Sequence, residues 1–171
     1  GGSGTGQYSA RVAFRQTPGS SPATYTYFMG SEQGPSASGS VTSALVQKFD
    51  DTGARMWSDS GVVVVPAVNS GPGRITPSPT ADGGCVCIGN FNAGVGYGSN
   101  AVYAAKIVDD SPGFGMVAWR TIVGSDTSTG KGRLDLVPVA GSDDVIVSQS
   151  SGSVLNAFKV NAATGAPGSI P

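Results

Sequence analysis

Short runs of alternating apolar and polar residues, separated by clusters of Gly, Pro, Asp and Ser, fill this chain of 171 residues. Runs of this length that are rich in Val, Ile, Thr and aromatic residues are typical of β-strands, and the clusters between them are typical of turns. The predicted strands are 9–16, 23–30, 43–50, 54–65, 74–80, 84–91, 101–109, 116–123, 133–140, 145–149 and 154–161, followed by a truncated strand within 165–171. The pattern therefore predicts three cycles of four antiparallel strands and almost no helix.

A lysine marks the same place in three copies of one segment. Lys48, Lys106 and Lys159 lie 58 and then 53 residues apart, and each precedes an apolar residue. A recurrent spacing of this size is the signature of a repeat architecture. We therefore expect an all-β fold of three four-stranded, blade-like repeats. The expected division is a flexible N-terminal arm, 1–8, and a single domain, 9–171, with repeats at about 9–70, 71–130 and 131–171.

The best copy of this segment, FDDTGARMW at 49–57, combines a strand end, a D-x-T-G turn and a tryptophan. Together with AFKVNAATG at 157–165 it resembles the blade signature of quinoprotein-type β-propellers. The resemblance implies propeller-like blades. The copies depart from the signature, because the period is near 60 residues rather than about 40–45, the third copy lacks the tryptophan, and the second has DDSPGFG for the turn. No positions match the metal ligands and stacking aromatics that a quinone cofactor needs in that family, so we expect no cofactor and no metal.

Three blades are too few to close a propeller, which typically has four to eight. Open sheet faces and edges would remain, and such surfaces promote association. A head-to-tail dimer forming a six-bladed ring, a filament, a longer parent chain or a compact three-bladed prism would each resolve this. Because the last strand is cut short, we expect an N-terminal segment or a neighbour's arm to complete the third sheet.

The composition narrows the function classes. Only 12% of residues are charged and the net charge is −1, which gives no basic stripe for nucleic acid. No apolar run approaches the roughly 18 residues of a membrane span. The chain contains no histidine, so a Ser-His-Asp or Cys-His arrangement is impossible within it. Low charge with abundant Ser, Thr and Gly favours an extracellular or surface-exposed protein, and we expect no enzymatic activity.

Three acidic pairs and the two tryptophans each have two interpretations. The pairs are Asp50–Asp51, Asp109–Asp110 and Asp143–Asp144. They could bind calcium through clustered oxygens, but Asp is common in turns because its side chain bonds nearby N–H groups, and we favour turns. A sugar-stacking platform could be formed by the aromatic residues Trp57, Trp119, Tyr25, Tyr27, Tyr97 and Tyr103. The equivalent repeat positions of the two tryptophans favour packing between blades instead.

The three lysines and the two cysteines also have two interpretations. The lysines could form a ring of positive charge. We expect instead that each ammonium group lies in solvent with its stem over apolar neighbours. Cys85 and Cys87 share one face of a strand, where a disulfide would be strained, so we expect buried free thiols rather than a redox or zinc site.

The leading functional hypothesis is a structural module that self-associates into a fibre, appendage, sheath or particle surface. The predicted assembly residues are Gly1, Gly2, Ser3, Gly4, Thr5, Gly6, Gln7, Tyr8, Gly168, Ser169, Ile170 and Pro171. The alternative is a glycan- or protein-binding module that uses the long loops 31–40 and 92–99. Its main recognition candidate is Tyr97, an aromatic residue in a glycine-rich loop, and the others are Asn92, Tyr25 and Tyr27.

Overall fold

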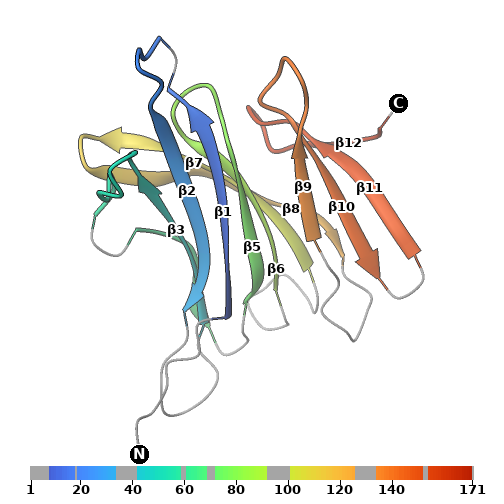
Figure 1. The fold of residues 1–171 in the computed structure, drawn as a ribbon. Coiled ribbons are helices and arrows are strands. Elements are labelled where there is room, and N and C mark those ends of the chain that lie inside the picture. Colours follow the sequence, from blue (N-terminus) through green and yellow to red (C-terminus); the bar gives the residue numbers. More distant parts are fainter. Residues whose placement is uncertain are drawn as a thin grey trace, which may run out of the picture.

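The computed structural model describes residues 8–17, 19–33, 42–58, 61–68, 72–91, 101–125, 134–151 and 154–170. These residues form twelve strands and no helix. The strands form three four-stranded antiparallel sheets, each made of four consecutive strands. The predicted all-β fold of three blade-like repeats is confirmed, and the arrangement is that of a partial propeller (Figure 1).

Each sheet keeps its strands in chain order. Sheet 1 contains β1 (Tyr8–Gln16), β2 (Tyr25–Gln33), β3 (Thr42–Phe49) and β4 (Val62–Val68). Sheet 2 contains β5 (Pro72–Pro79), β6 (Cys85–Phe91), β7 (Ala101–Ser111) and β8 (Phe114–Ser125). Sheet 3 contains β9 (Leu134–Pro138), β10 (Val145–Ser151), β11 (Val154–Val160) and β12 (Pro167–Gly168).

The three sheets lie side by side, with sheet 2 in the middle (Figure 1). The connections β1–β2, β5–β6 and β9–β10 gather at one end, the upper end in Figure 1, which we call the turn end. Each of these turns contains a glycine or serine whose N–H bonds back to the first turn residue.

A hydrophobic core lies between each pair of neighbouring sheets. Side chains alternate between the two faces of a strand, so the middle sheet contributes to both cores. Core 1, between sheets 1 and 2, contains Phe28, Ala44, Val46, Trp57, Val62, Val64, Ile75, Cys85, Cys87, Tyr103, Ala105 and Ile107. Core 2, between sheets 2 and 3, contains Val86, Ile88, Val102, Ala104, Leu134, Val145, Val147, Val160 and Ala162. Sheet 2 is thus buried on both faces, whereas sheets 1 and 3 each bury only one.

The structure corrects the fourth strand of the first repeat. We expected a strand over 54–65, but β4 starts only at Val62, and Trp57 lies in the irregular connection before it. The chain turns at Gly61, which has φ of 70° and lies against the carbonyl of Val46. This detour places the Trp57 ring in core 1 beside Phe28, with ring centroids 5.7 Å apart.

The third sheet also differs from expectation. Its fourth strand comes from the chain's own C-terminal segment, since β12 pairs with Lys159 and Val160 of β11. The first predicted strand, β1, pairs with β2 of sheet 1. We expected an N-terminal segment or a neighbour's arm to complete the third sheet, and because residues 1–7 lie outside the described residues this stays a prediction. Strand β12 has two residues where β8 has twelve, so most of the outer edge of β11 is unpaired among the described residues.

Candidate functional site

The prediction of solvated ammonium groups is wrong for Lys48 and Lys106. The side chains of Lys48 and Lys106 are only 6% and 7% exposed, and each contacts a carboxylate. Lys159, on the outer sheet, is 40% exposed and also paired. A buried ammonium group requires a carboxylate partner because its desolvation is costly. The three equivalent lysines therefore each form an ion pair with an aspartate of the same chain.

The first pair joins sheets 1 and 2. Lys48 Nζ lies 2.9 and 2.7 Å from the two oxygens of Asp109, at the end of β7. Trp57 Nε1 donates to Asp109 Oδ1 at 2.7 Å. The Lys48 Nζ also lies 5.7 Å from the Trp57 ring centroid and 5.9 Å from that of Phe28. One carboxylate therefore satisfies both the buried cation of sheet 1 and the indole N–H beside it.

The second pair lies within sheet 2. Lys106 Nζ lies 2.8 Å from Asp82 Oδ2, in the β5–β6 turn, and donates to Thr80 Oγ1 at 2.7 Å. Burial alone would raise the pKa of Asp82, but hydrogen bonds from Lys106, Thr80 and the N–H of Gly84 outweigh it and lower that pKa. The carboxylate is therefore held charged, and it stabilises the turn that surrounds it.

The third pair lies within sheet 3. Lys159 Nζ lies 2.8 Å from Asp144 Oδ2, at the end of the β9–β10 turn. The hydrogen bond from Lys159, with a second from the N–H of Ala162, lowers the pKa of Asp144. Sheets 2 and 3 thus use an acid from their own turn. The β1–β2 turn of sheet 1 has no acid, so Lys48 takes its partner from the next sheet.

Among the acidic pairs, Asp50 fits the turn interpretation that we favoured, whereas Asp109 and Asp144 each bind a lysine. Asp50 Oδ1 accepts from the Thr52 hydroxyl and from the N–H groups of Thr52 and Ala54, and the Thr52 bond is the main cause of its lowered pKa. Asp143 Oδ1 instead links three sheets, accepting from the N–H of Ala81 in sheet 2 and lying 3.4 Å from Arg15 Nη1 in sheet 1. Among the described residues no group of three His, Cys, Asp or Glu could hold a metal ion.

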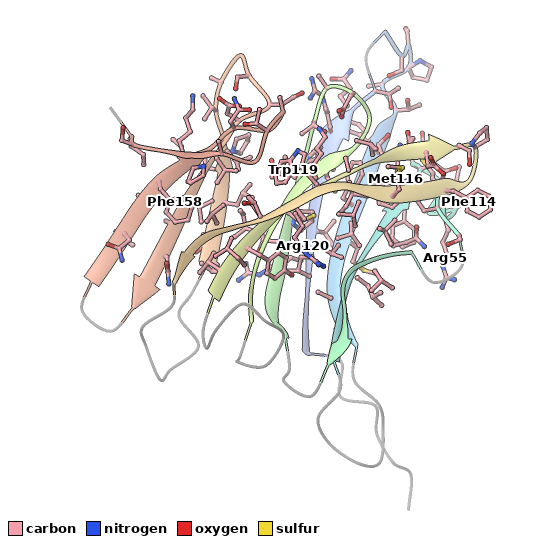
Figure 2. The ribbon with its side chains drawn as sticks, turned by 180° about the vertical axis from the view of Figure 1, so that it is seen from behind. Arg55, Phe114, Met116, Trp119, Arg120 and Phe158 are labelled. Carbon is pink, nitrogen blue, oxygen red and sulfur yellow. The ribbon has the colours of Figure 1, made fainter. Side chains whose placement is uncertain are left out.

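The two tryptophans pack between sheets, as we favoured, and each does so against a glycine of the next sheet. A Cβ added to Gly115 in β8 would lie 2.7 Å from ring atoms of Trp57. A Cβ added to Gly165, before β12, would lie 2.8 Å from the ring of Trp119, whose Nε1 donates to Ala162 O at 3.2 Å. Only glycine permits this approach. Figure 2 shows Trp119 on the β8 strand.

A cleft opens between sheets 2 and 3 at the turn end. It has a volume of about 520 Å³ and its polar lining includes Asp82, Lys106, Asp143 and Ser142. Trp119 and small residues such as Ala162 form the rest. Between sheets 1 and 2 the turn end has a smaller pocket of about 110 Å³, whose lining includes Arg15, Phe28 and Gly83. Neither this cleft nor the role of Asp82 was predicted from the sequence, although the repeated lysine and the aspartate in the β5–β6 turn could have indicated the role of Asp82.

The outer face of sheet 1 is apolar and uncovered in the described structure. Phe14 and Val12 of β1 are 62% and 63% exposed. Phe14 packs against Tyr25 and Tyr27 of β2, with ring centroids 5.9 Å apart in both cases. Phe49 lies in the same row, because Phe14 pairs with Tyr27 and Tyr27 with Phe49. We call this aromatic surface the open face of sheet 1.

Sheets 2 and 3 bury the side that corresponds to the open face of sheet 1. The residue after the repeated lysine is Phe49 in sheet 1, Ile107 in sheet 2 and Val160 in sheet 3. Ile107 and Val160 are completely buried, since the preceding sheet covers them, whereas Phe49 is partly exposed. The open face of sheet 1 is thus the one copy of this surface that no described sheet covers.

Sheet 3 has an open face on the opposite side of the repeat. In sheets 1 and 2 this side packs against the sheet that follows. Val137 and Leu155 on this side are 59% and 73% exposed. Ile146 and Lys159 share the face, because Val137, Ile146 and Lys159 are paired across the three strands. Each chain therefore presents one open face of each kind.

The predicted recognition and assembly residues fall in several places. Tyr25 and Tyr27 lie in the aromatic row of sheet 1, whereas Asn92 and Tyr97 lie outside the described residues. Residues 1–7 and 171 also lie outside them. Tyr8 begins β1, Gly168 ends β12, and Ser169 and Ile170 follow as exposed residues.

The cysteines are as expected. Cys85 and Cys87 are free and completely buried on one face of β6, with sulfur atoms 3.6 Å apart. Burial, with the neighbouring Cys85 thiol, raises the pKa of Cys87 well above its usual range. Both thiols therefore act as small apolar groups in core 1.

Comparison with protein-family models, curated proteins and solved structures found no match to this chain. The resemblance to quinoprotein-type blades therefore stays a prediction. None of the described segments is a helix long and apolar enough to cross a membrane.

Proposed function

We propose that this protein is a non-enzymatic assembly module, and that neighbouring copies join head to tail through their two open faces. The observation that carries the proposal is the aromatic open face of sheet 1. Its counterparts in sheets 2 and 3 are buried under the preceding sheet. Burying one Phe or Val side chain contributes about 1.5–3 kcal/mol, so several together favour association.

The interface would be heterologous, since the two faces that meet are different surfaces of the chain. A heterologous contact gives a closed ring if the rotation between copies closes and a filament if it does not. A ring of two copies would contain six blades, within the range of closed propellers. A fibre, appendage, sheath or particle surface would follow from the open case. We place such an assembly outside the cell, on the low charge and the Ser, Thr and Gly content.

The predicted N-terminal assembly segment of a neighbouring copy would bind along the open edge of β11. Its residues 154–158 have a described strand on one side only. Such an edge can accept a further strand. An extended arm of residues 1–7 would span about 23 Å, which exceeds the roughly 17 Å of five paired residues. Deleting residues 1–7 should weaken association if a neighbour's arm occupies this edge.

The experiment compares two exposed phenylalanines. Phe14 lies on the open face of sheet 1, and Phe114, near the tip of the β7–β8 hairpin in Figure 2, is similarly exposed at 56%. We expect light scattering after size exclusion, with negative-stain imaging, to show oligomers for the native protein and for Phe114→Ser. Phe14→Ser should shift the population towards the 17.0 kDa monomer. A native protein that stays monomeric at all concentrations would refute the proposal.

A glycan- or protein-binding module is the second candidate, and the cleft between sheets 2 and 3 favours it. Carboxylates beside an indole can accept hydroxyl hydrogen bonds from a sugar while the ring contacts its apolar face. A panel of monosaccharides and oligosaccharides, screened by ligand-observed NMR, tests this directly. Binding that Asp143→Ala abolishes without changing the mass would support this function in place of assembly.

A further inference from the structure

Both internal interfaces use the same contact between a tryptophan and a glycine. Trp57 packs on Gly115, and Trp119 packs on Gly165. Each tryptophan lies four residues after a glycine of its own turn, Trp57 after Gly53 and Trp119 after Gly115. Each repeat therefore has a turn glycine on which an indole of the preceding repeat can pack. The position four residues after this glycine is the one from which a tryptophan packs on the following repeat.

The first repeat has an acceptor glycine with no indole on it. Gly53 lies in the D-x-T-G turn with φ of 83°, and a Cβ built there would have no atom within 4 Å. The third-repeat counterpart, Gly165, has φ of 74° and is covered by Trp119. Both turns are held by the side-chain oxygen of the first residue, Asp50 or Asn161. The vacant acceptor lies at the start of the series, beside the open face of sheet 1.

The last repeat lacks the indole that would continue the series. Four residues after Gly165 stands Ser169, which is exposed and follows β12. We propose that the open face of sheet 1 binds sheet 3 of a second copy, with Ser169 of that copy opposite Gly53. The contact between copies is then a version of the internal interfaces without tryptophan, and for that reason weaker and reversible. This inference rests on the proposed head-to-tail assembly.

Charge supports this orientation. The Lys48–Asp109 pair shows a lysine of one sheet reaching the acidic turn of the next. At the open faces the corresponding groups are Lys159, which is 40% exposed on sheet 3 and paired with Asp144, and the Asp50–Asp51 turn, which carries Gly53. Head-to-tail packing brings this cation towards those carboxylates, whereas two copies of the sheet 1 face would bring the acidic turns together.

The test restores the missing indole. Ser169→Trp should tighten association by about tenfold or more in sedimentation velocity, because an aromatic ring fills the vacant position on Gly53. Ile170→Trp adds the same side chain one residue beyond the four-residue spacing that separates Trp57 and Trp119 from their turn glycines, and should not. Adding Gly53→Ala to Ser169→Trp should return the dissociation constant to the native value, since a Cβ at the equivalent glycines would lie within 2.8 Å of the indole.

A second variant does not depend on the tryptophan. Asp51→Lys should weaken association of the native protein, with a smaller loss at high salt because both charges are exposed. Native protein that associates, but gains no more from Ser169→Trp than from Ile170→Trp and is unaffected by Asp51→Lys, overturns this inference and leaves the assembly proposal standing. Native protein that stays monomeric, with Phe14→Ser having no effect, overturns the assembly proposal itself.

Discussion

Removing Asp109 should destabilise the fold far more than removing its cationic partner. Asp109→Ala leaves the Lys48 ammonium, 6% exposed, without its carboxylate and the Trp57 N–H without its acceptor. Losing one partner of a fully buried pair costs about 3–5 kcal/mol. An orphaned N–H adds about 1–3 kcal/mol. Because Asp109 itself is 47% exposed, water can enter the space and reduce both costs.

We therefore expect Asp109→Ala to lower the free energy of unfolding by about 2–3 kcal/mol, or about 5–10 °C in Tm for a chain of this size. Lys48→Met is the informative comparison. It keeps the apolar stem against Phe28 and Trp57, and it leaves Asp109 half-exposed and still bonded to the indole. Exchange of a buried cation for an apolar side chain of similar volume is often close to neutral, so we expect a change within about 1 kcal/mol.

Urea denaturation followed by tryptophan fluorescence, at one low protein concentration, measures both changes. Asp110→Ala is the matched control, because this neighbouring carboxylate is exposed and its loss should change stability by less than about 0.5 kcal/mol. Equal costs for Asp109→Ala and Lys48→Met would refute the reasoning, since the argument depends on which group is buried. An Asp109→Ala cost no larger than that of Asp110→Ala would show that the pair contributes nothing.

Two further predictions concern the turns and the inter-sheet glycines. The pKa values of Asp82 and Asp144 are lowered in the folded state, so their stabilisation is complete above the unfolded value of about 3.9 and is lost as the pH falls through the lower folded values. The urea midpoint should therefore fall at acid pH, and the Asp82→Asn, Asp144→Asn double variant should show a smaller fall; an unchanged acid dependence would contradict this. Gly115→Ala should lower the unfolding free energy by about 1–3 kcal/mol, because its Cβ would overlap the Trp57 ring, whereas at Gly124 the nearest atoms are 3.9 Å away and alanine should be tolerated. Similar denaturation midpoints for the two glycine variants would show that the indole contact is not tight.

The local pattern was sufficient for the strands of the second repeat. Its runs at 84–91 and 101–109 are short and mostly apolar, with turn residues before the first and after the second, and β6 and β7 match them closely. A short apolar run bounded by turn residues is typical of a strand buried on both faces, and it can be recognised from residues adjacent in the chain. The fourth strand of the first repeat was misplaced because Trp57 is recruited to core 1 by Phe28 and Gly115, and Gly115 lies 58 residues away in the sequence.

The partners of the repeated lysines could not be predicted from spacing. Lys48, Lys106 and Lys159 occupy one repeat position, yet they pair with Asp109 of the next sheet, or with Asp82 or Asp144 of their own. The choice depends on which turn carries an acid and which sheet lies above the lysine. We expected solvated ammonium groups because the isolated strand end is exposed, and the adjacent sheet removes that exposure at Lys48 and Lys106 but not at Lys159.

The sequence by itself determined the all-β class, the three repeats and their order, because strand periodicity, turn residues and recurrent spacing are local properties of the chain. It also placed Cys85 and Cys87 on one buried face. Only the tertiary structure decided which faces are covered. Stacking buries both sides of sheet 2, leaves one side of sheets 1 and 3 open, and converts identical repeat positions into buried ion pairs or exposed contact surfaces. The physical reason is that desolvation depends on the neighbouring sheet, and no window of sequence contains it.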